Sequence, residues 1–243
     1  GNTTEFVSQN NVSQNNMSDE ERYGGTMSTW SYYSEQETTE FSTTGKVVTA
    51  DGKSIDFNIN LRMSRSFVES TSSVINFGAA QYKDPLVINL NCGAVEVTDQ
   101  KFYFDIDADG NEEYISQLGA GSGYLALDKN GDGIINDGSE LFGTSSGNGF
   151  ADLAQYDQDG NGWIDEADEI FDKLKIWSVD ENGNSTLIGI GQAGVGAIYL
   201  GSSDTEFSLN DSQNNTNAVV RKTGIFLYEN GISGTIQQLD MAT

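Results

Sequence analysis

Apolar and polar residues alternate with a period of two in the first third of the chain, most clearly at Ile55, Phe57, Ile59, Leu61 and Met63. Successive side chains of a β-strand point to opposite faces, so this pattern predicts a strand with one apolar face. Asp51 and Gly52 form a typical turn pair, and a β-hairpin is therefore predicted over residues 41–67. Its apolar face needs a partner, for which we expect the strand predicted over residues 86–90.

A second hairpin is predicted near the C-terminal end of the sequence. Two apolar runs, residues 218–228 and 232–239, lie either side of Asn230 and Gly231. A further strand is predicted over residues 197–200. These strands are expected to flank the middle of the chain and to pair with the first hairpin.

The apolar pattern between the two hairpins is typical of short helices. Residues 151–156 read as one or two helical turns, and residues 167–177 carry apolar side chains at positions 170, 171, 174 and 177. This spacing is helical and predicts a helix, a loop and a second helix in succession.

The loop between these two segments has the spacing of an EF-hand calcium site. Aspartate, aspartate and asparagine occupy positions 1, 3 and 5, Gly162 allows the sharp turn at position 6, and a carboxylate closes the loop at position 12. Calcium takes about six to eight oxygen ligands, which this alternation supplies together with a backbone carbonyl at position 7. The predicted ligands are Asp157, Asp159, Asn161, Trp163, Asp165 and Asp168.

Residues 128–140 repeat this spacing with one difference. Position 12 is Ser139, and the carboxylate of Glu140 comes one residue late. An extra residue within 136–139 can bring Glu140 to the ion, and Asp137 is the alternative ligand. A solvated acidic turn would explain the charges, but not the same phasing twice. The predicted ligands are Asp128, Asn130, Asp132, Ile134, Asn136, Asp137 and Glu140.

A third acidic loop begins at Asp105 and departs from the pattern in its second half. Glu112 stands where an apolar residue is expected and Ser116 where a carboxylate is, so Glu112 or Glu113 would have to complete the site. The predicted ligands are Asp105, Asp107, Asp109, Asn111 and Glu113. A fourth stretch, residues 180–184, lacks the turn glycine and the closing carboxylate and is predicted to be a polar turn.

These elements predict an α+β fold in which β-hairpins flank an EF-hand-like calcium-binding region with short helices. We expect a polar N-terminal tail over residues 1–35, a hairpin region over 36–83 and a calcium-binding module over 84–201. A C-terminal hairpin over 202–243 is expected to pack with residues 36–83.

Composition points to hard-metal chemistry. The chain has 37 acidic and 12 basic residues, a net charge of -25, and residues 105–168 hold fifteen of the carboxylates with one base, Lys129. Such a field repels nucleic acid and anionic membranes and attracts cations. The absence of histidine removes Ser-His-Asp and Cys-His catalysis and the usual zinc sites. Cys92 is alone, so no disulfide framework is predicted, and no apolar run approaches the length of a membrane span.

Asp84-Pro85 is the peptide bond most open to self-cleavage on chemical grounds, because the aspartate carboxylate can attack its own carbonyl carbon while the proline nitrogen leaves. The order Asp-Pro-Leu, DxDxDG, LDxNGDGIINDGSELFG, FADLAxYDxDGNGWID, LKIW and AIYL resembles the self-processing module of iron-regulated RTX proteins over about residues 84–200. In that family too, the glutamate matching Glu140 is one position late. The resemblance implies calcium-dependent cleavage between Asp84, the nucleophile, and Pro85, the new N-terminus. The activated aspartate can then be joined to a lysine amine, which would make another protein a partner.

One stretch departs from that family. Its DxDGDG run after the Asp-Pro-Leu strand is replaced here by residues 89–94, which carry no carboxylate, so that calcium site is expected to be absent and the chain to stay mostly intact. The sequence therefore favours a calcium-binding structural or interaction module, with calcium-triggered, single-turnover cleavage at Asp84-Pro85 as the alternative. A glycosidase is disfavoured because no carboxylate pair stands outside metal-like spacing. Millimolar extracellular calcium would suit the loops, which favours an extracellular or cell-surface location.

Overall fold

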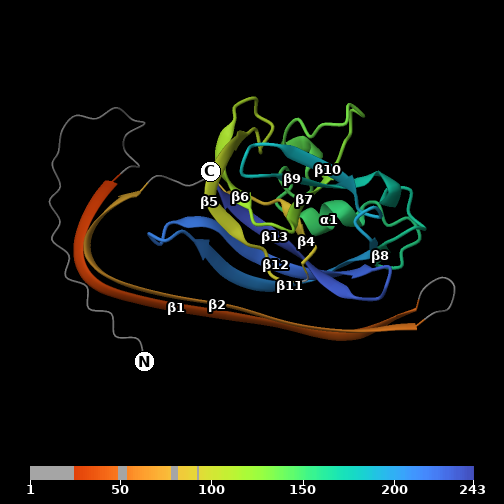
Figure 1. The fold of residues 1–243 in the computed structure, drawn as a ribbon, viewed down its shortest axis with the longest axis horizontal. Coiled ribbons are helices and arrows are strands. Elements are labelled where there is room, and N and C mark those ends of the chain that lie inside the picture. Colours follow the sequence, from red (N-terminus) through yellow and green to blue (C-terminus); the bar gives the residue numbers. More distant parts are fainter. Residues whose placement is uncertain (1–24, 49–53, 78–81, 92) are drawn as a thin grey trace. The chain divides into compact units, whose positions relative to one another are not determined.

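β-Strands make up most of the fold in the computed structural model, which describes residues 25–48, 54–77, 82–91 and 93–243 (Figure 1). Within these residues the helical elements are α1 (Gly149–Ala154) and two 3-10 helices, η2 (Gly138–Glu140) and η3 (Phe171–Lys173). The predicted α+β class with EF-hand helices is therefore wrong, and the arrangement is β-sandwich-like. None of the described helices is long and apolar enough to cross a membrane.

Nine of the described strands form one antiparallel sheet. Eight follow one another in the order β10 (Ser185–Gly189), β9 (Leu174–Val179), β7 (Ser122–Leu127), β4 (Leu86–Asn89), β13 (Ser233–Ala242), β12 (Thr216–Tyr228), β11 (Val195–Asn210) and β8 (Trp163–Ile164). The ninth, β3 (Tyr82–Lys83), pairs with β13 next to β4.

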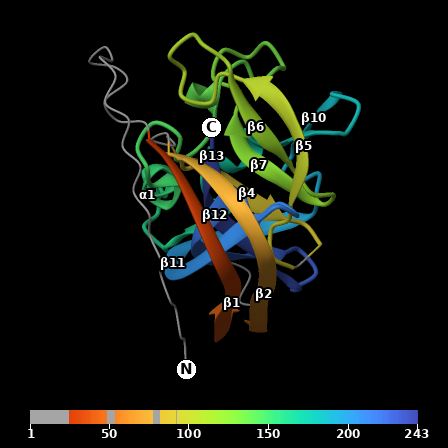
Figure 2. The same ribbon diagram turned by 90° about the vertical axis from the view of Figure 1, so that its left-hand side faces the viewer.

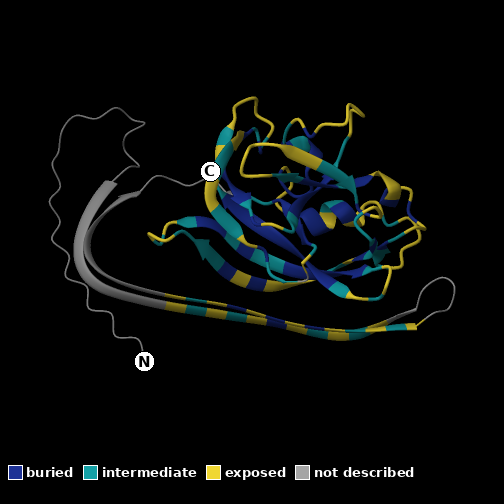
Figure 3. Ribbon diagram, in the orientation of Figure 1, coloured by how far each residue is buried: buried dark blue, intermediate teal, exposed yellow. Residues whose placement is uncertain are grey.

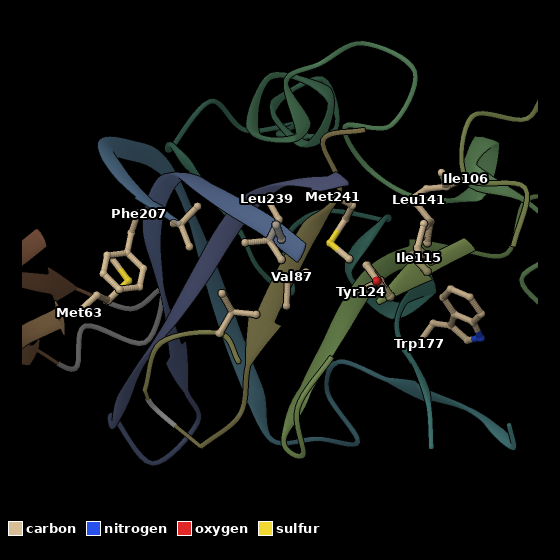
Figure 4. Packing of buried hydrophobic residues seen from close by; sticks show 14 of the residues in the cluster. Met63, Val87, Ile106, Ile115, Tyr124, Leu141, Trp177, Phe207, Leu239 and Met241 are labelled. Carbon is tan, nitrogen blue, oxygen red and sulfur yellow. The ribbon is translucent and has the colours of Figure 1, made fainter. Parts of the chain in front are cut away.

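The central strands of this sheet are apolar on both faces. In β4, Leu86 and Ile88 belong to one buried cluster and Val87 to another, because successive side chains of a strand point to opposite faces. Figure 3 shows buried residues along these strands, and Figure 4 shows Val87 beside Leu239 in one of the two clusters. The core therefore lies on both sides of β4, which starts immediately after Pro85.

A separate hairpin consists of β5 (Val97–Phe104) and β6 (Glu113–Leu118), joined by the acidic loop that begins at Asp105. The ring of Phe104 packs on Trp177 of β9, with ring centroids 4.6 Å apart. Figure 2 shows this hairpin beside the sheet. The acidic loop is thus held by a hairpin rather than by helices.

Strand β1 (Gly25–Val48) pairs with β2 (Ser54–Phe77), so the predicted N-terminal hairpin is present. The alternation along its second strand is confirmed, because Ile59, Leu61 and Met63 are buried and the residues between them are exposed. The predicted turn at Asp51 and Gly52 lies outside the described residues. Val87, in the strand expected to cover this face, belongs to the same buried cluster as Ile59, Leu61 and Met63, whereas the hydrogen-bonded neighbours of β4 are β7 and β13.

The C-terminal hairpin is confirmed as β12 and β13. Its turn contains Gly231 at φ +84°, where the Gly231 amide donates to the Tyr228 carbonyl at 2.8 Å. The strand predicted over residues 197–200 lies inside β11. Strand β1 begins inside the stretch predicted as a polar tail, and the rest of that stretch, like Cys92, lies outside the described residues.

The helix predicted over residues 167–177 is wrong. Turns and η3 lead directly into β9, in which Leu174 and Ile176 are buried in one cluster and Trp177 in the other. Strand β9 pairs with β7 on one side and β10 on the other, and this pairing requires extended backbone. Sheet pairing thus overrides the local helical spacing.

Residues 38–63 and 82–243 form one compact unit, which contains every site described below. The domain boundaries expected near residues 35, 83 and 201 stay predictions.

Candidate functional site

Three acidic loops share one backbone arrangement: the Asp105 loop (residues 105–113), the Asp128 loop (128–140) and the Asp157 loop (157–168). In each, the first aspartate accepts a hydrogen bond of 2.9 to 3.0 Å from the amide of the glycine five residues later. These glycines are Gly110, Gly133 and Gly162, with φ values of +93°, +81° and +82°. Residues other than glycine rarely adopt such positive φ values. The glycine at position 6 is therefore required by the turn.

Polar side chains at positions 3, 5 and 9 converge in the Asp128 loop. Asn130 Nδ2 donates to Asp132 Oδ2 at 3.0 Å and to Asn136 Oδ1 at 2.8 Å. Asn136 Nδ2 donates to the same Asp132 oxygen at 3.2 Å. Three side chains spread over seven residues thus point to one place.

The same three positions converge in the Asp157 loop. Asn161 Nδ2 donates to Asp159 Oδ2 at 3.1 Å and to Asp165 Oδ2 at 3.2 Å. Two loops with different neighbours in the fold therefore gather equivalent side chains.

The closing carboxylates of these two loops make equivalent contacts although one is a residue later. Asp168 accepts the amides of Gln158 at 2.6 Å and Asp165 at 3.1 Å, which are positions 2 and 9 of its loop. Glu140 accepts the amides of positions 2 and 9 of its own loop at 2.9 and 2.8 Å. Both carboxylates are buried, Glu140 at 5% and Asp168 at 2% exposure. The longer glutamate side chain and the turn of η2 compensate for the extra residue.

The side chain of Asp137 does not point into the Asp128 loop as that of Glu140 does. Its carboxylate accepts the amide of Ser139 at 2.8 Å and so caps the N-terminus of η2. Glu140 rather than Asp137 therefore points into the Asp128 loop.

The Asp105 loop is completed by Glu113. Its Oε2 accepts the amide of Ile106, position 2, at 2.9 Å, so it occupies the place that Asp168 and Glu140 have in their loops. Asn111 donates through Nδ2 to Asp109 at 3.0 Å. Asp107 differs from its counterparts, because it forms an ion pair with Lys83 at 2.8 Å. The hydrogen bond from this lysine lowers the pKa of Asp107.

Carboxylate oxygens lie close enough to hold a metal ion in two of the loops. In the Asp105 loop, one carboxylate oxygen from each of Asp105, Asp107 and Asp109 lies within 4.8 Å of the other two. The same is true of Asp157, Asp159 and Asp168 in the Asp157 loop. All donors are oxygens, which suits a hard cation.

Position 7 is held in the same way in two loops. The amides of Ile134 and Trp163 donate to the side chain at position 5, at 2.8 and 2.7 Å. The ring of Trp163 also packs against Tyr199 with centroids 4.9 Å apart. In contrast, residues 180–184 form a plain turn between β9 and β10, in which Asp180 accepts the amides of Asn182 and Asn184.

The Asp84-Pro85 bond lies in a break between two short strands. Both β3 and β4 pair with β13, and the two residues between them belong to neither. The Leu239 amide on β13 donates to the Pro85 carbonyl at 3.1 Å, and the Leu86 amide donates to Phe142 at 2.9 Å. Pro85 is buried and Asp84 partly buried. The bond is therefore fixed from both sides.

The carboxyl group of Asp84 is hydrogen-bonded to that of Asp240 on β13. Burial and this second carboxyl raise the pKa of Asp84 to about 7. Asp240 in turn accepts a hydrogen bond from Arg221 Nε on β12 at 2.5 Å. Asp84 therefore keeps its proton below a pH of about 7, beside the carboxyl group of Asp240.

Two glycines allow the chain to approach Asp84 closely. A Cβ atom at Gly143 would lie 2.1 Å from the Asp84 carbonyl oxygen, and one at Gly147 would lie 3.6 Å from Asp84 Oδ2. Gln238, buried on β13, donates to the Gly147 carbonyl at 3.0 Å and accepts the Gly149 amide at 3.1 Å. Residues 143–149 are thus held against Asp84.

Comparison with known proteins identifies the family. Residues 86–242 match the SPM domain, which is more than half of the chain. The chain belongs to the SPM domain family. Iron-regulated protein FrpA of Neisseria meningitidis serogroup C is 33% identical over 106 residues, 39% of this chain and 10% of that protein. The chain thus corresponds to a small part of this RTX-related relative.

The SPM domain of this chain departs from the RTX resemblance at Asn89. Its side chain is 1% exposed and donates to Thr235 Oγ1 at 2.9 Å and to Gln237 Oε1 at 3.0 Å. It also accepts a bond from Ser122 Oγ at 3.0 Å. A buried, neutral amide with three hydrogen bonds therefore lies where the resemblance led us to expect an acidic residue.

The acidic loops of the SPM domain are connected by short segments to the Asp84-Pro85 junction. After Glu140 the chain passes through Leu141 and Phe142 to Gly143, beside Asp84. The Gly138 amide donates to the Asp105 carbonyl at 2.8 Å, which joins the first two loops. Helix α1 then leads from Gly149 to the Asp157 loop. One continuous segment thus links two loops and covers the junction between them.

Sequence reasoning missed the residues around Asp84 that come from the C-terminal hairpin. No local motif marks Gln238 and Asp240, since they are two of several polar residues that occur among apolar ones along β13. Arg221 could have been noticed as one of few basic residues in the chain. Only the pairing of β13 with β3 and β4 brings them to Asp84.

Proposed function

We propose that this SPM domain is a calcium-binding structural module whose Asp128 and Asp157 loops, and also the Asp105 loop, are EF-hand-like calcium sites. The observation that carries the proposal is the equivalence of the closing carboxylates. Glu140 and Asp168 lie at different sequence positions but accept the same two backbone amides of their loops. A solvated acidic turn has no reason to bury a carboxylate in this way.

The residues that would hold the ions are those predicted, except that Asp137 acts as a helix cap. A bound calcium ion would supply positive charge among carboxylates that otherwise repel one another. Asparagine amides that now donate to neighbouring carboxylates can rotate to present oxygen to the ion.

Calorimetry and thermal unfolding test this function. Calcium should raise the melting temperature, because an ion that binds only the folded state stabilises it by mass action. Asp128→Ala and Asp157→Ala should each remove part of the increase. Magnesium should bind more weakly, since it requires a tighter octahedron. An unchanged melting curve with calcium and with chelator would rule out this function.

A second function is favoured by the surroundings of Asp84: calcium-triggered, single-turnover cleavage of the Asp84-Pro85 bond. Asp84 sits beside a partner carboxyl group, and its neighbour Pro85 is buried and held by β13. Attack by the Asp84 carboxyl group on its own carbonyl carbon is intramolecular, so fixing the two groups can accelerate it greatly. The activated aspartate would then react with water or with the lysine amine of another protein.

The segment over residues 141–149 supports a link between calcium and cleavage. It begins at the closing carboxylate of one loop and contacts Asp84 through Gly143 and Gly147. Without ions, repulsion within the loops would loosen this segment and free Asp84. Extracellular calcium would then act as the trigger, which agrees with the expected location outside the cell.

Intact mass spectrometry tests the cleavage. The whole chain is incubated with millimolar calcium or with chelator, and fragments ending at Asp84 and beginning at Pro85 are expected only with calcium. Asp84→Ala should remove them. Asp204→Asn is the matched control, because this exposed aspartate pairs with Lys222 on the same sheet. Persistence of the intact chain in calcium would reject cleavage but not calcium binding.

A further inference from the structure

Four charged side chains form a row across adjacent strands at the junction. Asp84 lies between β3 and β4, Asp240 on β13, Arg221 on β12 and Glu206 on β11. Arg221 joins the last two carboxylates, with Nε 2.5 Å from Asp240 Oδ2 and Nη1 2.7 Å from Glu206 Oε1. Asp240 is only 6% exposed. A buried carboxyl group thus separates the reactive aspartate from the guanidinium.

We propose that Asp240 is the catalytic residue that transfers the proton during cleavage of the Asp84-Pro85 bond, and that Arg221 positions it. This inference rests on the cleavage function proposed above. Asp240 contacts the reacting carboxyl group directly. Its neighbour Leu239 donates to the Pro85 carbonyl at 3.1 Å, so the same stretch of β13 holds both sides of the bond.

The reaction needs a group that can both accept and donate a proton. Asp240 removes the proton of the Asp84 carboxyl group while an oxygen of that group forms a bond to the Asp84 carbonyl carbon. The bond from this carbon to the Pro85 nitrogen breaks, its electron pair stays on nitrogen, and Asp240 returns the proton there. The products are a cyclic anhydride at Asp84 and a secondary amine at Pro85, and water opens the anhydride to two carboxyl groups. The chain has no histidine to perform this transfer.

The proton transfer requires that the Asp84 carboxyl group carries a proton, and this requirement sets the pH dependence of the cleavage rate. Burial and the contact with Asp240 raise the pKa of Asp84 to about 7, so Asp84 keeps its proton below that pH and loses it above. The rate should therefore fall as pH rises through about 7. The other charged side chains around Asp84 and Asp240 are Lys83, Asp152, Glu206 and Arg221. Of these, Arg221 favours the ionised form of Asp84 and so lowers its pKa.

The test measures initial cleavage rates of the whole chain in calcium across this pH range. Asp240→Asn should slow cleavage at least about 100-fold and remove the fall near pH 7, because an amide cannot carry the proton. Asp240→Glu keeps an acid and should retain part of the rate and the fall. Asp204→Asn should behave as wild type. Carbon NMR should find a carboxyl group titrating near pH 7 in the wild type, and Asp240→Asn should move this titration to lower pH, since only burial then raises the pKa of Asp84.

The outcomes separate this role from the cleavage function. If folded Asp240→Asn cleaves at the wild-type rate with the same pH profile, Asp240 has no catalytic role and cleavage still stands. If Asp240→Asn does not fold, Asp240→Glu decides, and a folded Asp240→Glu variant whose cleavage rate no longer falls near pH 7 would reject the role. If the wild-type chain stays uncleaved at every pH, both the cleavage function and the catalytic role of Asp240 are rejected.

Discussion

The acidic loops and the Asp84-Pro85 junction gather carboxylates in opposite ways. Each loop takes its side chains from about a dozen consecutive residues, and backbone amides already fix their directions. The junction brings Asp84 together with Arg221 and Asp240, which lie on the two strands of the C-terminal hairpin, far along the chain from Asp84. A loop is therefore encoded locally, whereas the junction exists only after the sheet has formed.

Under the proposed function, the local loops would sense calcium, and the bond at the distant junction would respond to it. The loops are exposed at their tips, where ions can enter, and the bond is buried beside β13. Residues 141–149 are the shared element. A change in this segment should affect the junction without affecting the loops, and a change in a closing carboxylate should affect both.

The largest effect is expected for Gly143→Ala. The added Cβ would lie 2.1 Å from the Asp84 carbonyl oxygen at a residue with φ +98°, so the segment must move away from the bond. Misplacement by about 1 Å can cost about 100-fold in rate. Mass spectrometry should show cleavage slowed by at least that factor, with calcium stoichiometry unchanged by calorimetry.

Gly183→Ala is the control for Gly143→Ala. It has φ +78° and no atom within 4 Å of the added Cβ, so it introduces similar backbone strain without a clash. Equal cleavage rates in the two variants would show that close approach of residue 143 is not needed.

An intermediate effect is expected for Glu140→Gln and Asp168→Asn. Each change removes one charge from a closing ligand and should weaken calcium binding at its own loop by at least about tenfold. Calorimetry measures the loss, and Asp172→Asn, an exposed neighbouring carboxylate, is the control. A weak effect of Glu140→Gln beside a strong effect of Asp168→Asn would mean that the late glutamate does not close its loop.

The smallest effect is expected for Asp137→Ala. Loss of a helix cap costs about 1 kcal/mol of folding free energy, because the Ser139 amide loses its partner. Urea unfolding should show this decrease while calcium affinity stays the same. A large loss of affinity would instead make Asp137 a ligand and contradict its assignment as a cap.

Local features of the fold could be predicted from the sequence. Alternation at Ile59, Leu61 and Met63 and the turn at Gly231 gave two hairpins, because strand periodicity and positive φ act over a few residues. The sequence offers Glu140 or Asp137 to close the Asp128 loop, and the amides of Lys129 and Asn136 donate to Glu140. Binding of an ion by Glu140 stays a prediction.

Features that depend on distant pairing could not be predicted. Residues 167–177 have helical spacing, but Leu174 and Ile176 are held between β7 and β10, and the gain from pairing both edges exceeds a weak helical preference. The sequence around Asp240 likewise contains no motif that marks it as a site residue. Nothing within its own strand indicates that β13 passes Asp84.

The most direct test of the account follows calcium binding and bond cleavage in one titration. Ions in the acidic loops are proposed to hold the Asp84-Pro85 junction in a reactive arrangement. Calorimetry and intact mass at the same free calcium concentrations should give one midpoint for ion uptake and for the appearance of the fragments 1–84 and 85–243, with no fragments in chelator. Full occupancy of the loops with the chain still whole, or equal cleavage in chelator, would contradict the claim.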